Sequence, residues 1–110
     1  MIAKTLLDYL DSVLDVPVVM EAPERTSDYV LIDQTGSSRT NHIITTTFAI
    51  QSYGDSLYEA MVLNEEVKNA MVGFAELGNV TRVELQTDYN FTNTATKQYR
   101  WQAVFLITHY

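Results

Sequence analysis

Two histidines, several serines and fourteen acidic side chains are the residues that could support chemistry in this 110-residue chain. His42 and His109 lie far apart, and neither has a second histidine or a carboxylate at the spacing of a metal site. A zinc centre needs several nitrogen, sulfur or oxygen donors that converge on one point, and the chain has no cysteine. We therefore expect no metal site, and we expect both histidines to serve packing or the surface.

One loop of small residues resembles a phosphate-binding motif only in outline. Residues 35–40 read Thr-Gly-Ser-Ser-Arg-Thr, and they lack the second glycine and the lysine that a P-loop requires. No serine lies in a G-x-S-x-G elbow, and Ser56 with Glu59 forms the S-x-x-E pattern of a helix start instead. Glu65 and Glu66 are adjacent on a predicted helix and point apart. The sequence therefore predicts no enzyme and no cofactor.

Composition favours contacts with proteins over contacts with nucleic acid or membranes. The formal net charge of −7 suits neither the neutralisation of phosphates nor adhesion to an anionic membrane surface. The chain contains seven tyrosines, a residue type that protein interfaces favour. The longest apolar run, residues 103–107, is too short to cross a bilayer, and the acidic N-terminus does not fit a secretion signal. We therefore expect a soluble, intracellular protein.

The length predicts a single domain, residues 1–110, that contains two helices. Apolar side chains recur at helical spacing over residues 2–14. Pro17 ends this helix, because the residue before a proline avoids the α region. The capping box opens a second helix, which we predict over residues 56–77. Gly73 inside it costs about 1 kcal/mol relative to alanine, and it marks an early end or a close contact.

Strands are predicted in the remaining segments, which are rich in β-branched and aromatic residues. Alternation over the longest segment places Phe48 and Ile50 on one face and most threonines on the other, although Thr46 falls on the apolar face. The predicted strands are residues 18–20, 29–35, 40–53, 79–88 and 98–110, with loops over residues 36–39 and 90–96. The expected fold is α+β, with two helices on one face of a mixed, mainly antiparallel sheet in the order α-β-β-β-α-β-β.

Three local patterns and the order of the elements resemble a known family. A strand ends in a Thr-Gly turn at residues 29–36, an S-x-x-E-A motif opens the helix at residues 56–60, and a closing strand follows over residues 97–110. Together they are similar to the tail-terminator and minor tail proteins of siphophages, which include the lambda tail terminator. The likeness spans nearly the whole chain. It implies a six-fold ring at the head-proximal end of the tail tube, which stops tube polymerisation and presents a surface to the head connector.

The resemblance also implies partners and a location, while the candidate interface residues come from the predicted loops and from the arginines. The implied partners are further copies of the chain, the tail tube protein and a head-completion or connector protein, with DNA only passing through the ring. The implied locations are the host cytoplasm during assembly and the tail–neck junction of the virion. A ring interface joins two different patches of each subunit, so arginines suit pairing with acidic neighbours. The candidate interface residues are Arg25, Gly36, Ser37, Ser38, Arg39, Asn90, Phe91, Thr92, Asn93 and Arg100.

Two alternative functions fit the same sequence. The first is a neighbouring neck role, as a head–tail joining protein that stays on the head instead of on the tail. The second is a small α+β ligand-binding domain, which a closed pocket and a bound metabolite in a monomer would favour.

Overall fold

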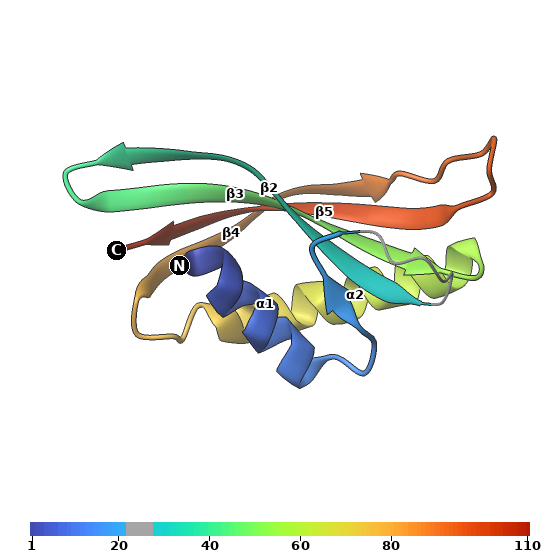
Figure 1. The fold of residues 1–110 in the computed structure, drawn as a ribbon, viewed down its shortest axis with the longest axis horizontal. Helices are drawn as coiled ribbons and strands as arrows, with labels where there is room; N and C mark the ends of the chain where they lie inside the picture. Colours follow the sequence, from blue (N-terminus) through green and yellow to red (C-terminus); the bar gives the residue numbers. More distant parts are fainter. Residues whose placement is uncertain (22–27) are drawn as a thin grey trace.

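The fold places two helices on one face of a five-stranded sheet (Figure 1). The computed structural model describes residues 1–21 and 28–110. The elements are α1 (Ile2–Val13), β1 (Val18–Val19), β2 (Tyr29–Thr40), β3 (Ile43–Gly54), α2 (Leu57–Phe74), β4 (Val80–Asn90) and β5 (Tyr99–His109). The strand order is β1-β2-β3-β5-β4, with β1 parallel to β2 and every other pair antiparallel. The predicted α+β class, element order and layout are confirmed.

The hydrophobic core lies between the helices and the facing side of the sheet. α1 contributes Leu6 and Leu10, α2 contributes Val67 and Phe74, and β3 contributes Phe48, all without solvent exposure. Burying a side chain of this size contributes about 1.5–3 kcal/mol, so this layer outweighs any single polar contact. The core therefore covers one face of the sheet, and both described helices lie on that face.

The end of α1 and the start of α2 follow from residues close to them in the sequence. α1 ends at Val13, because the next residue is extended and Pro17 follows shortly after. The Ser56 hydroxyl accepts a hydrogen bond from the Glu59 backbone N–H at 3.1 Å, which confirms the predicted cap of α2. α2 ends at Phe74, earlier than the predicted end at residue 77.

Gly73 is the point at which α1 contacts α2. A Cβ at Gly73 would overlap the Tyr9 hydroxyl, which donates a hydrogen bond to the Ala70 carbonyl at 2.7 Å. The Tyr9 ring also packs against Phe74, with centroids 5.3 Å apart. The predicted close contact at Gly73 is therefore confirmed, and it accounts for a glycine inside a helix.

The predicted loop over residues 36–39 is wrong, because these residues belong to β2. The strand passes through one register shift and pairs with β3 as far as its last residue. The turn is made instead by Asn41 and His42, whose φ angles are 51° and 72°. Small polar residues are typical of turns. Strand pairing in a hairpin, however, also provides hydrogen-bond partners for their backbone N–H and C=O groups. His42 consequently lies in a turn and not, as predicted, in a strand.

Thr46 and His109 form a polar pair inside the apolar layer. Thr46 is 1% exposed and His109 is 5% exposed, and the threonine hydroxyl lies 2.8 Å from Nε2 of the imidazole. Each side chain therefore satisfies the other, as buried polar groups require. The apolar-face position predicted for Thr46 and the packing role predicted for His109 are both confirmed.

Two hairpins project from opposite ends of the sheet along its long axis (Figure 1). The β2–β3 hairpin ends in a segment that we call the arm, residues 33–43, in which every residue is exposed. The predicted β4–β5 hairpin is confirmed, and its connection, residues 91–98, is called the β4–β5 loop. The molecule measures 44 × 25 × 23 Å, and the two projections account for its elongation.

Candidate interaction surface

The sheet face turned away from the helices, here called the open face, carries a set of polar side chains with matched partners. Phe48 points into the core, so the alternation of strand side chains places Gln51 and Tyr53 on the open face. Their partners across the β3–β5 ladder are Gln102 and Arg100. The antiparallel register therefore aligns glutamine with glutamine and tyrosine with arginine.

Hydrogen bonds run in one direction through these side chains. The Arg100 guanidinium donates from Nη1 to the Tyr53 hydroxyl at 3.2 Å, and that hydroxyl donates to Oε1 of Gln51 at 2.6 Å. Nε2 of Gln51 donates to Oε1 of Gln102 at 2.8 Å, and Nε2 of Gln102 donates to the Tyr89 hydroxyl. Each bond polarises the next in such a chain. The network therefore links β5, β3 and β4 across the open face.

Aromatic rings extend the network on both sides. Tyr29 stacks on Tyr53, with centroids 4.3 Å apart, and Tyr89 meets Phe91 edge-on at 5.9 Å. The Arg100 guanidinium lies 4.3 Å above the Phe91 ring and donates from Nε to the Phe91 carbonyl at 2.6 Å. Arg100 therefore ties the start of the β4–β5 loop to the sheet.

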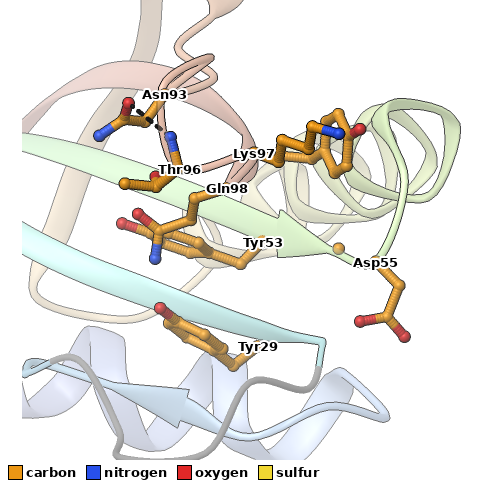
Figure 2. A pocket seen from close by; sticks show the side chains of 9 residues that line it. Tyr29, Tyr53, Asp55, Asn93, Thr96, Lys97 and Gln98 are labelled. Atoms are coloured by element: carbon orange, nitrogen blue, oxygen red, sulfur yellow. Dashed lines mark hydrogen bonds between the residues drawn. The ribbon is translucent and has the colours of Figure 1, made fainter.

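A cavity of about 540 Å³ lies where the open face meets the β4–β5 loop (Figure 2). The stacked Tyr29 and Tyr53 line it from the strands, and Asn93, Thr96 and Lys97 line it from the loop. The Asn93 carboxamide accepts a hydrogen bond from the Thr96 backbone N–H at 3.4 Å, which holds the turn of the loop. Aromatic, amide and ammonium groups of this kind provide contacts for a polar partner.

The stacked tyrosines predict how stability depends on pH. Burial raises the pKa of Tyr29 above its ordinary value of 10.0, the neighbouring Tyr53 raises it further, and Arg100 partly offsets both effects. The folded state therefore favours the neutral phenol. Its contribution is complete below about pH 10 and is lost as the pH rises through the folded pKa.

We expect the free energy of unfolding to fall as the pH rises above about 10, and to fall less steeply in a Tyr29→Phe variant. Hydrogen bonds to Asp88 and Glu65 raise the pKa of Lys68, so deprotonation of this lysine at high pH also lowers stability. Only the difference between the wild type and the Tyr29→Phe variant therefore measures the effect of Tyr29. Urea denaturation at each pH measures it. Tyr58→Phe, at a position that is 70% exposed, is the control, and equal slopes for all three proteins would contradict the expectation.

Three carboxylates gather at the start of α2, an arrangement that the sequence analysis missed. Oxygen atoms of Asp28, Asp55 and Glu59 all lie within 4.8 Å of one another. Such oxygens suit Ca²⁺ or Mg²⁺, but Asp55 and Glu59 are exposed, and the Glu59 carboxylate accepts the Asp55 backbone N–H at 3.2 Å. Helix capping, which favours negative charge at a helix N-terminus, accounts for Asp55 and Glu59 but not for Asp28. Asp28 lies near the other two carboxylates only because β2 pairs with β3, so no local sequence pattern predicts the cluster.

The predicted interface residues fall into two groups at opposite ends of the molecule (Figure 1). The first group lies on the arm and comprises Gly36, Ser37, Ser38 and Arg39. The second group lies at the β4–β5 loop and the strand ends beside it, and comprises Asn90, Phe91, Thr92, Asn93 and Arg100. Arg25 lies outside the described residues. Arg100 differs from the rest, because its guanidinium bonds within its own chain.

The sequence analysis also missed three exposed apolar residues on one flank of α2, with Glu65 and Lys68 between the second and the third. Leu57 and Met61 are about 40% exposed and Val72 is 74% exposed, although the helix already buries another apolar stripe against the sheet. Positions 57, 61 and 72 share one flank at 3.6 residues per turn, so helical spacing did contain the signal. The apolar stripe that faces the core hid this signal, because both sets of apolar residues lie on the same helix.

The architecture is that of an α+β domain with a bonded network on its open face and a hairpin at each end. A scan against protein-family models and a search of curated proteins give no match to this chain. Within the described residues, neither helix combines the length and the apolar character that crossing a bilayer requires. Since a fold alone does not define function, the function is argued from the surfaces.

Proposed function

We propose that the protein is a structural component of phage tail assembly, which forms a ring at the head-proximal end of the tail tube. There it stops tube polymerisation and presents a surface for head joining. The observation that carries the proposal is the pair of hairpins that project from opposite ends of one sheet (Figure 1). A component placed between two structures needs two separate contact surfaces, and the arm and the β4–β5 loop supply them.

Both projections are stiff enough to act as contact surfaces. The arm is held by strand pairing up to Thr40 opposite Ile43. The β4–β5 loop is held by Asn93 and Gln98, whose backbone groups exchange hydrogen bonds of 3.0 and 3.1 Å. A surface that is ordered before binding loses less entropy when a partner docks. This order in two opposite projections supports a role in joining.

The charge of the chain also supports the proposal. A ring through which DNA passes works best without a strongly cationic lumen, because phosphate contacts would hold the DNA. The net charge of −7 fits such a ring. Arg39 on the arm is then suited to pairing with an acidic partner.

A second candidate function is a ligand-binding domain, which the cavity beside Tyr29 and Tyr53 favours. Its volume of about 540 Å³ falls within the range of small-molecule pockets, about 300–1,000 Å³. The assembly role is preferred because it uses both ends of the molecule, whereas a ligand in the cavity would use one.

We expect that inactivation of this gene in its phage or prophage yields overlong or ragged-ended tails beside separate, DNA-filled heads. The physical reason is that nothing then caps the growing end of the tube. Negative-stain electron microscopy of the induced lysate measures tail length directly. The control is the same strain with the wild-type gene supplied from a plasmid, which restores whole particles if the defect comes from this gene.

The other outcomes point to other functions. Free tails of normal length beside filled heads would assign the protein to the joining step in the neck. Fully assembled infectious particles would refute the assembly role and favour the ligand-binding domain.

A further inference from the structure

The sheet ends in two open edges within the part of the chain that the structure describes. On one side, β4 is the terminal strand. On the other side, β1 pairs only with Val30 and Leu31, so the rest of β2 has no described neighbour along its outer edge. Open edges carry unpaired backbone groups and are templates for pairing with another strand. Each molecule therefore offers two edges that a second strand could extend.

The two open edges run in opposite directions. β2 is antiparallel to β3, β3 to β5, and β5 to β4, so β2 and β4 point opposite ways. A rotation about an axis along the strands leaves strand directions unchanged. The β4 edge of one copy therefore meets the β2 edge of the next copy as an antiparallel neighbour. Contacts of this head-to-tail kind give a ring when the rotation closes.

An apolar groove of about 320 Å³ lies beside the β4 edge, between that strand and α2. Its apolar lining consists of Met71, Val72, Ala75, Val83, Leu85 and Phe105. Val72 is 74% exposed and Leu85 is 44% exposed. Lys68 also lines the groove, but Asp88 at 2.6 Å and Glu65 at 2.9 Å already pair with it. A partner can therefore cover the groove without burying an unpaired charge.

The opposite side of the molecule carries an exposed apolar side chain beside the β2 edge. α1 contacts β1, whereas α2 contacts β3, β5 and β4, so α1 lies on the β1 side of the helix layer. Met20, directly after β1, is 45% exposed on this side. When the β4 edge of one sheet pairs with the β2 edge of the next, the helix layers also become neighbours. The α1 side of the second copy then faces the groove of the first.

We propose that a second copy of this chain occupies the α2–β4 groove, with its β2 edge beside β4 and its α1 side over Val72 and Leu85. This interface rests on the proposed function, because it supplies the contact that closes the ring. Val72 is its centre, because its side chain is 74% exposed and lines a groove whose other residues are mostly apolar.

The first test replaces Val72 with lysine and compares assembly of the full-length chain by sedimentation velocity, from micromolar to millimolar concentration. We expect the wild type to form one closed oligomer. Val72→Lys should raise the concentration of half-assembly by about tenfold or more, because loss of an interface anchor costs at least that factor. Asn69→Lys is the matched control: it adds the same charge at an exposed position of the same helix outside the groove. Circular dichroism checks that each variant folds.

A second measurement identifies which surfaces meet. The chain has no cysteine, so Val72→Cys and Met20→Cys can be purified separately, mixed and treated with a short bis-maleimide. Crosslinked dimers should form in the mixture and not in either variant alone, because a head-to-tail contact joins two different surfaces. Crosslinks within the Val72→Cys sample alone would overturn the proposal in favour of a two-fold contact.

The two proposals fail in different ways. A wild-type chain that stays monomeric at every concentration, or a Val72→Lys variant that assembles like the wild type, overturns the interface. Overlong tails after gene inactivation would still support the assembly role in that case. Conversely, normal particles after gene inactivation refute the assembly role, while the assembly and crosslinking data continue to support the interface.

Discussion

An Arg100→Ala variant is expected to lower the free energy of unfolding by about 2–3 kcal/mol and to release the β4–β5 loop. The guanidinium donates to the Phe91 carbonyl and to the Tyr53 hydroxyl, and it lies over the Phe91 ring. Hydrogen bonds to charged groups contribute about 1.5–3 kcal/mol, and an exposed cation–π contact adds about 0.5–1 kcal/mol. Because Arg100 is only half-buried, solvent weakens each contact, and the expected loss is smaller than the sum of these ranges.

Two further variants test whether this geometry is the cause. Arg100→Lys keeps the charge but loses the planar fork of donors, so it should recover only part of the stability. Arg82→Ala removes an arginine that is 70% exposed and paired with Glu84, and it should change stability by less than about 1 kcal/mol. Urea denaturation followed by the fluorescence of Trp101, the single tryptophan, measures stability, and hydrogen exchange over residues 91–98 measures release of the loop. If Arg100→Ala proved as stable as Arg82→Ala, Arg100 would not tie the loop to the sheet.

A Gly54→Ala variant is expected to lower the free energy of unfolding by about 2–3 kcal/mol through overpacking. A Cβ at Gly54 would lie 2.7 Å from the backbone nitrogen of Ala60 and 3.0 Å from the carbonyl carbon of Glu59. Both atoms belong to the first turn of α2, which the Ser56 cap holds in place. Backbone cannot rotate away as a flexible side chain can, so either the helix start or the end of β3 must shift.

The matched control for Gly54→Ala is Gly36→Ala in the paired strand. A Cβ at Gly36 would meet nothing within 4 Å, so this variant should change stability by less than about 0.5 kcal/mol. Thermal unfolding of the wild type and both variants gives the comparison. Because alanine is no worse than glycine in a strand, equal losses for the two variants would contradict the contact with α2 as the cause. Gly36→Ala also leaves the arm folded, so its effect on particle assembly reports contact at the arm alone.

The amino-acid sequence alone determined the elements whose signals are local. The S-x-x-E pattern at Ser56 and Glu59 predicted the start of α2, and Pro17 predicted where α1 stops. Alternation around Phe48 and Ile50 predicted which side of β3 faces the core. Each of these signals depends on residues within a few positions of one another, so no distant contact is needed to interpret them.

The candidate site followed from the sequence only in part. The β4–β5 loop was predicted because a polar segment rich in threonine and asparagine separates two strand-like segments, but part of the arm, residues 36–39, was mistaken for a loop. A segment of small polar residues has no apolar face to reveal a strand, and only the ladder to β3 assigns it. The exposed flank of α2 that carries Leu57, Met61 and Val72 was masked by the core-facing stripe of the same helix.

Only the tertiary structure determined the hydrogen-bond network of the open face and the directions of the two open sheet edges. Tyr53 and Arg100 lie 47 positions apart, and they meet because the register of β3 and β5 places them opposite one another. A shift of one residue would move either side chain to the other face of the sheet. The opposed directions of the β2 and β4 edges likewise follow from the strand order. Pairing of distant strands depends on how the whole core packs, so no local pattern encodes it.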